Sequence, residues 1–205
     1  MFLAGAVAVL AGISLAGPNS PSGKPDAPSV SREPKPLDPT QAPAGAAAGD
    51  VNPEALPPGV PADAQRAIVA KNVDGDTIWV EITEPGGTLA AGAVHKVRIL
   101  EINTPESTNR TECFGAQASE FAKRELPVGS TVFLAADKQD RDRFGRFLRY
   151  VWKSNGDFYN EKAVVLGFAK VVLYRPNDRF IERLRAAEAR AREAAAGLWD
   201  VCVAP

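Results

Sequence analysis

Apolar and polar residues follow a strand-like pattern in five short stretches, each rich in Val, Ile and other residues that favour β-structure. These predicted strands span 67–73, 77–82, 94–102, 132–135 and 147–152. The first two flank a tight-turn sequence, 74–77, which reads Asp-Gly-Asp-Thr, and are therefore expected to form a hairpin.

Three later stretches show the apolar spacing of helices. They span 115–126, 160–168 and 178 to about 197. We expect Asn160 and Asp178 to cap the second and third helices and Gly197 to lie at the end of the last. Strands followed by helices predict an α+β fold, and the pattern alone does not specify more.

The first 65 residues have a different composition. Residues 1–16 are almost wholly apolar, which predicts a signal peptide or a short membrane anchor. Residues 17–65 carry 12 of the 17 prolines and few large apolar side chains, so we interpret them as a disordered Pro/Ala-rich linker. The folded domain is then 66–205.

Charge changes this picture little. The chain has 24 Lys and Arg against 25 Asp and Glu, for a net charge of −1. Residues 66–205 hold 21 of the basic and 19 of the acidic side chains. Any binding of phosphate must therefore depend on where individual arginines lie rather than on net charge.

Cys113 and Cys202 are the two cysteines. An even number in an apparently exported chain predicts one disulfide, which would tie the loop before the first helix to the tail after the last. Two free buried thiols are the alternative.

The segment 97–106 carries the first candidate chemistry. Arg98 lies in an apolar run, which is costly unless its guanidinium meets an anion. Pro105 ends the strand, so the following loop presents Asn103, the Thr104 carbonyl and Glu106 close together. An arginine, oxygen donors and a carboxylate suit a metal-assisted phosphodiester site.

Two further motifs fit the same chemistry, and together the three resemble the staphylococcal nuclease family. They are the Asp-Gly-Asp-Thr turn at 74–77, the segment 98–106, and Asp-Arg-Phe-Gly-Arg at 142–146. Four details differ from the family pattern. Asn103 stands where the family usually has Asp, and the third motif has one extra spacer. Phe144 and Val172 stand where the family has tyrosines. The resemblance covers about 68–200.

The resemblance implies a five-stranded OB-fold β-barrel with three helices and a secreted, Ca²⁺-dependent, sugar-nonspecific nuclease. Its substrates would be DNA and RNA, and its products would end in 3′-phosphates. The apolar first segment, rather than the resemblance, predicts a protein that is secreted or anchored on the outer face of a bacterial cell membrane. A monomer is expected, and no protein partner is implied.

The resemblance also implies roles for individual residues. Arg98, Glu106 and Arg146 would be catalytic, the two arginines on the phosphoryl oxygens and Glu106 as general base. Asp76, Asn103 and the Thr104 carbonyl would bind the metal, with Asn103 contributing no charge. Arg143 and Phe144 would bind substrate through charge and base stacking.

Each assignment has a structural alternative. Asp76 could be an ordinary turn residue, Arg98 could pair with Glu101 or Glu106, and Glu106 and Arg146 could be solvated surface charges. The alternative function is a non-catalytic nucleic-acid-binding module of the same fold. Asn103 favours that module, whereas retention of Arg98, Glu106 and Arg146 favours the enzyme.

Overall fold

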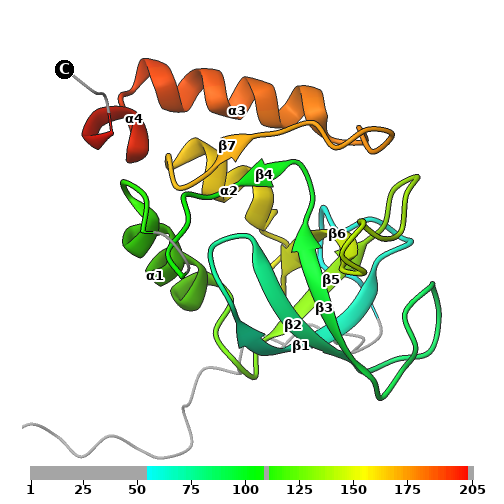
Figure 1. The fold of residues 1–205 in the computed structure, drawn as a ribbon. Coiled ribbons are helices and arrows are strands. Elements are labelled where there is room, and N and C mark those ends of the chain that lie inside the picture. The colour runs from blue at the N-terminus through cyan, green and yellow to red at the C-terminus, as the bar shows by residue number, and fades with distance from the viewer. Residues whose placement is uncertain (1–54, 109–110, 203–205) are drawn as a thin grey trace, which may run out of the picture. The chain divides into compact units, whose positions relative to one another are not determined.

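Five strands close into a β-barrel in the computed structural model, which describes residues 55–108 and 111–202 (Figure 1). They are β1 (Gln65–Asn72), β2 (Thr77–Ile82), β3 (Val94–Ile99), β5 (Thr131–Ala135) and β6 (Phe147–Lys153). The order around the barrel is β1-β2-β3-β6-β5, and β3 and β6 run parallel while the other neighbours are antiparallel. The predicted α+β OB-fold barrel is confirmed.

Side-chain alternation explains why these strands form a barrel. On β2, Ile78, Val80 and Ile82 are buried while Trp79 and Glu81 between them are more exposed. Such a strand stabilises the fold by removing one apolar face from water, while its other face remains solvated.

The helices gather beside the barrel, as Figure 1 shows. They are α1 (Gly115–Glu125), α2 (Tyr159–Val165), α3 (Ile181–Glu193) and α4 (Leu198–Val201). Aromatic side chains join helices to barrel: Trp152 stacks on Phe158 with ring centres 4.5 Å apart, and Tyr150 meets Phe180 edge-on at 4.7 Å. Three helices match the prediction, and the short α4 is additional.

The predicted third strand is wrong at its end, because the chain leaves the barrel after Ile99. Glu101 has a left-handed backbone with φ of 58°, and the two-residue strand β4 (Ile102–Asn103) then pairs with β7 (Lys170–Val171) instead. Arg98 Nη1 donates to the carbonyls of both Ile99 (2.6 Å) and Ile102 (2.7 Å), so one guanidinium brackets the bend.

Both predicted helix caps are also wrong. Asn160 lies inside the first turn of α2, where its amide accepts from Val151 N (3.0 Å) and donates to Leu100 O (2.8 Å). Asp178 pairs with Lys138, and α3 begins only at Ile181. Long-range partners therefore compete successfully for both polar side chains.

The described chain begins before the predicted domain boundary at 66. Leu56, Val60 and Ala64 pack against the barrel core, and Asp63 pairs with Arg179 at 2.7 Å. Residues 1–54, which hold the expected leader and most of the expected linker, lie outside the described residues. Within the described ranges, none of the helices has the length and apolar character needed to cross a membrane.

Glu101 is fully buried at the β3–β4 bend (0% exposed), and neither carboxylate oxygen has a well-aligned hydrogen-bond partner among the described residues. Burial, together with the nearby Asp137 charge, raises the pKa of Glu101 to about 7, although the Tyr150 hydroxyl opposes the rise. The folded protein therefore keeps this carboxyl protonated at pH values where the unfolded chain has released the proton.

Glu101→Gln is expected to stabilise the protein at high pH. Because the pKa is about 7 when folded and 4.5 when unfolded, the wild type loses stability as pH rises from about 4.5 to 7. The variant should gain up to roughly 3 kcal/mol at pH 8 and little at pH 4. Urea unfolding across this range measures the effect.

The matched control is Glu120→Gln, which changes an exposed carboxylate on α1. Its unfolding free energy should follow the wild-type pH profile. Equal pH dependence in wild type and Glu101→Gln would contradict a buried, protonated Glu101.

Candidate active site

Asp76 lies at the turn that joins β1 to β2, and it is 6% exposed. Its Oδ2 accepts from the backbone N (2.9 Å) and the hydroxyl (3.2 Å) of Thr104, and its Oδ1 accepts from the Thr77 hydroxyl (3.1 Å). Gly75 permits this contact, because a Cβ there would lie 2.5 Å from Thr104 Cγ2. The Tyr159 hydroxyl holds the turn from below by donating to Gly75 O at 2.6 Å.

Arg98 connects this turn to the rest of the site. It is 4% exposed, and its Nη2 lies 3.1 Å from Asp76 Oδ2, 3.0 Å from Asn103 Oδ1 and 2.9 Å from the Tyr174 hydroxyl. The anion that its buried position requires is therefore Asp76, rather than Glu101 or Glu106.

A second carboxylate adds negative charge beside this pair. Asp74 Oδ1 accepts from the Asp76 backbone N at 3.0 Å. Burial and the neighbouring Asp76 charge raise the pKa of Asp74 to about 6. Two close carboxylates of this kind form an environment that favours a bound cation.

The side-chain amide of Asn103 does not have the orientation that a metal ligand would need. Its Oδ1 faces Arg98, and its Nδ2 donates to the Thr104 carbonyl at 3.4 Å. A half-turn of the amide would exchange the two atoms and place an oxygen beside that carbonyl. Among the described residues, no three His, Cys, Asp or Glu side chains form a metal-binding group. The oxygen donors suit Ca²⁺ in kind, provided that the amide rotates.

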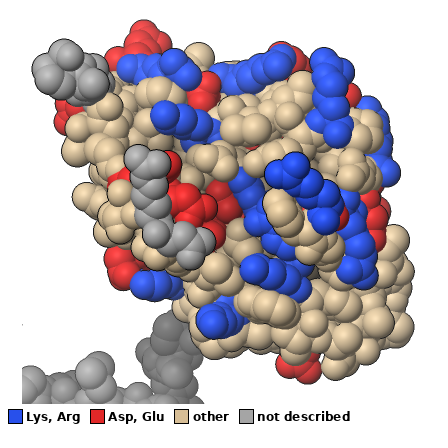
Figure 2. Space-filling model, in the orientation of Figure 1, with Lys and Arg blue, Asp and Glu red and all other residues tan. Residues whose placement is uncertain are grey.

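A cleft of about 420 Å³ opens beside Arg98. Its lining includes Arg143, Phe144 and Arg146, which the sequence predicted as site residues, together with Tyr174 and Arg175. Phe144 is 68% exposed, and the guanidinium carbons of Arg143 and Arg146 lie 4.7 and 5.5 Å from its ring centre, so the remaining ring surface can stack on a base. Figure 2 shows basic side chains gathered beside acidic ones on the face that it draws.

Asp142 holds the loop that carries these residues. Its Oδ1 accepts from the backbone N of Phe144 and of Arg146, both at 2.9 Å, and its Oδ2 pairs with Arg146 Nε at 2.6 Å. Burial alone would raise the pKa of Asp142, but the pairing with Arg146 holds it below its usual value. No described residue engages the terminal nitrogens of Arg146 by a hydrogen bond or an ion pair, so they are available to an anion.

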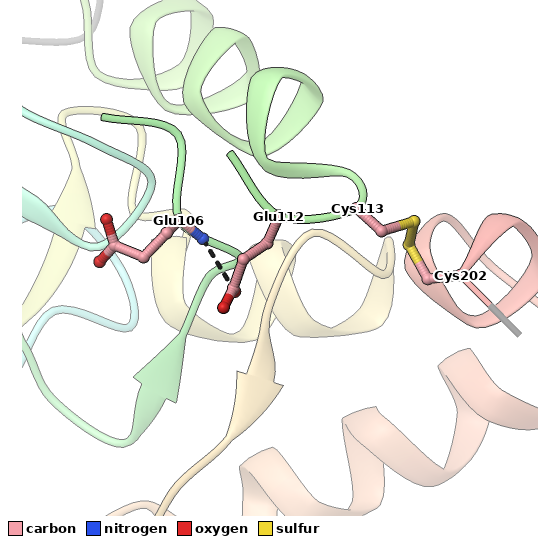
Figure 3. Close-up of a disulfide and its surroundings, with 4 residues drawn as sticks. All are labelled: Glu106, Glu112, Cys113 and Cys202. Atoms are coloured by element: carbon pink, nitrogen blue, oxygen red, sulfur yellow. Dashed lines mark hydrogen bonds between the residues drawn. A yellow bond between two sulfur atoms is a disulfide. The ribbon is translucent and has the colours of Figure 1, made fainter. Parts of the chain in front are cut away.

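Glu106 stands apart from the residues that line the cleft. It is exposed, and among the described residues its carboxylate takes only a 3.4 Å contact, from the Thr108 hydroxyl. Figure 3 shows the side chain pointing away from Glu112, whose carboxylate accepts from Glu106 N at 3.1 Å. Glu112 N also donates to Glu106 O at 2.9 Å, so two hydrogen bonds hold the Glu106 backbone.

Three supporting residues lie outside the motifs that predicted the site. Tyr174 binds Arg98, Tyr159 binds the Asp76 turn, and Glu112 binds the Glu106 backbone. Tyr159 lies 84 residues from its partner in the chain and Tyr174 lies 76. Only the aromatic-basic pair Tyr174-Arg175 could have indicated a surface that contacts nucleic acid.

The predicted disulfide is present between Cys113 and Cys202 (Figure 3). Cys113 follows Glu112 directly, so the bond anchors the segment that holds the Glu106 backbone. Gly115 permits the same close approach, because a Cβ there would lie 2.1 Å from Glu106 O.

Comparison with known proteins identifies several relatives of this chain. Residues 96–201 match the profile of the family described as Staphylococcal nuclease homologue. A thermonuclease of Staphylococcus hyicus is 34% identical over 142 residues, covering 68% of this chain and 78% of the relative. A thermonuclease of Staphylococcus intermedius is 29% identical over 136 residues, covering 65% and 75%.

An SPbeta prophage-derived endonuclease of Bacillus subtilis is 34% identical over 132 residues, covering 62% of this chain and 42% of that protein. The range matched by the family profile includes Arg98, Glu106 and Arg146, and it excludes Asp76.

Removing the disulfide by Cys113→Ser with Cys202→Ser is expected to lower the free energy of unfolding by roughly 2–5 kcal/mol, because the bond closes a long loop in the unfolded chain. Hydrogen exchange should also speed up at the amides of Glu106 and Glu112. Urea unfolding and exchange mass spectrometry measure both effects, with reduced wild type as the control. Unchanged exchange at these two amides would show that the bond does not anchor the segment.

Proposed function

The chain belongs to the staphylococcal nuclease family, and we propose that it is a secreted, Ca²⁺-dependent nuclease that hydrolyses phosphodiester bonds of DNA and RNA to 3′-phosphate ends. One observation carries the proposal. Arg98 pairs with the buried Asp76 and also lines a cleft. Arg143, Phe144 and Arg146 line the same cleft. Such a cleft presents fixed positive charge to a phosphodiester.

In this proposal the two arginines bind the scissile phosphoryl group. A guanidinium matches the geometry of two phosphate oxygens, and it stabilises the negative charge that grows in the transition state. Arg146 supplies free terminal nitrogens, while Asp142 fixes its Nε. Arg98 supplies a rigid charge, because carbonyl, amide and hydroxyl oxygens already hold its guanidinium in place.

Asp76, the Thr104 carbonyl and Asn103 would hold the Ca²⁺. A bound Ca²⁺ would act as a Lewis acid that polarises the phosphoryl group and lowers the pKa of a water bound to it. Glu106 would accept the proton of the attacking water, a role that suits an exposed carboxylate on a fixed backbone.

Phe144 and Arg143 would bind the nucleotides that flank the bond. Stacking on an aromatic ring tolerates any base, and phosphate contacts do not depend on the sugar. Both properties are consistent with cleavage of DNA and RNA alike.

A non-catalytic nucleic-acid-binding module is the second candidate. Asn103 favours it, because the amide lacks the negative charge that a ligand carboxylate would provide and its NH₂ faces the Thr104 carbonyl. The set Arg98, Glu106 and Arg146 favours the enzyme, since binding alone does not require an exposed, weakly engaged Glu106.

Export, with release or anchoring on the outer face of a bacterial membrane, is part of the proposal. The Cys113–Cys202 bond supports it, because disulfides persist in oxidising compartments. We also propose that the protein acts as a monomer.

Arg146→Ala and Glu106→Gln are each expected to lower kcat on single-stranded DNA at saturating Ca²⁺, the arginine by on the order of 10²–10³. Glu106→Gln should also remove the acidic limb of the pH–rate profile. Arg183→Ala and Glu120→Gln, both on exposed helix surfaces, are the matched controls. Wild-type digestion that proceeds equally well in a chelator would contradict the metal-dependent mechanism.

Asn103→Asp is expected to increase the apparent affinity for Ca²⁺, because the carboxylate adds attraction at the cation site. Pairing of the new carboxylate with Arg98 and its repulsion from Asp76 should offset part of the gain in affinity. A Ca²⁺ titration of cleavage measures the change, with Asn155→Asp on an exposed loop as the control. If the wild type shows no metal-dependent cleavage and Asn103→Asp does not create it, the binding-module function replaces the enzyme.

A further inference from the structure

A second groove, of about 330 Å³, lies on the other side of the Asp142–Arg146 loop. Phe144 and Arg146 line both this groove and the cleft beside Arg98, so the two hollows adjoin each other along this loop. Besides Val94, His95 and Gly145, the second groove is lined by three aromatic and three basic side chains, and none of its lining residues carries a carboxylate. These six are Trp79, Phe144, Phe147, Lys96, Arg141 and Arg146.

The strand register aligns this groove with the site. On the outer face of the β2–β3 pair, Thr77 lies opposite Arg98, and Trp79 lies opposite Lys96. The second pair is two residues further along each strand, roughly 7 Å away. One or two nucleotides of a single strand can span that distance.

Trp79 is unusual for an outward position on a barrel strand. Its indole is partly exposed although the large apolar residues next to it on β2 are buried. Lys96 Nζ lies 5.9 Å from the ring centre, and no aromatic side chain stacks on it within the described residues. Lys96 thus contacts the Trp79 indole, while the rest of the ring surface can stack on a base.

Arg141 and Phe147 also line the groove. The Arg141 guanidinium carbon lies 3.6 Å from the Phe147 ring centre, and Arg141 Nη1 donates to Gly145 O at 3.1 Å. This fixed charge faces a groove without lining carboxylates, so the groove attracts anions.

We propose that this groove is an extended substrate subsite, in which a single-stranded nucleic acid leaving the cleft at Phe144 stacks a base on Trp79 and sets its phosphates against Lys96 and Arg141. The proposal rests on the proposed function and adds where the strand runs beyond the scissile bond. A single strand fits better than a duplex, because stacking on a side chain requires an unpaired base.

The consequence is a dependence on substrate length. A two-nucleotide substrate occupies the cleft alone, whereas an oligonucleotide also reaches Trp79. The ratio of kcat/KM for an oligothymidylate of about twelve nucleotides to that for a dinucleotide should therefore exceed one in the wild type. It should fall about fivefold or more in Trp79→Thr, mainly through KM.

Conservative and charge variants separate stacking from phosphate binding. Trp79→Phe keeps a stacking ring and should restore most of the ratio. Lys96→Ala should reduce the slope of log affinity against log salt by about 0.7, as expected when one phosphate contact is lost. Trp199→Leu is the matched control, because Trp199 also lies beside basic side chains but lines neither hollow.

Circular dichroism and thermal melting establish that each variant is folded before it is assayed. Anisotropy of the fluorescein-labelled oligothymidylate measures binding in parallel, with and without Ca²⁺. If the wild type cleaves neither substrate, the proposed function fails, and the anisotropy still decides whether Trp79 and Lys96 bind a single strand. The subsite is overturned if Trp79→Thr and Lys96→Ala change neither the length ratio nor the affinity, or if duplex DNA competes better than single strands.

Discussion

The buried ion pair between Arg98 and Asp76 joins the two halves of the site. Asp76 belongs to the β1–β2 turn, and Arg98 lies at the end of β3, where it also bonds the carbonyls of Ile99 and Ile102. Removing one partner of such a pair leaves an uncompensated buried charge, which typically costs about 3–5 kcal/mol. The same interaction therefore closes the bend, orders the turn and holds a guanidinium beside the cleft.

The bend that this pair stabilises also has a cost. Glu101 adopts a left-handed backbone there and is buried beside Tyr150, so its proton is retained to about pH 7. Its backbone carbonyl nevertheless accepts from Val172 N at 3.1 Å, which joins the bend to the strand near Tyr174. The bend at Glu101 thus supports the geometry of the site while its burial lowers the folding stability at neutral and higher pH.

The Asp142 loop gives the molecule its substrate-facing surface. One carboxylate fixes the backbone at Phe144 and Arg146, which line hollows on both sides of the loop. Because these hollows share a wall, charge and stacking surface extend from Arg98 to Trp79 along the outer face of β2 and β3. A small barrel with almost no net charge can therefore offer a local binding path for phosphates.

The sequence by itself determined the α+β class, the barrel strands, the three main helices and the pairing of Cys113 with Cys202, because periodicity and cysteine number are local or countable properties. Its three motifs also contain Asp76 and Asn103, which contact Arg98, and Phe144 and Arg146, which line the adjoining cleft. It did not determine where the third strand would bend, which partners Asn160 and Asp178 would take, or that Tyr159 and Tyr174 support the site. Those features depend on contacts between residues far apart in the chain, and only the tertiary structure brings such residues together.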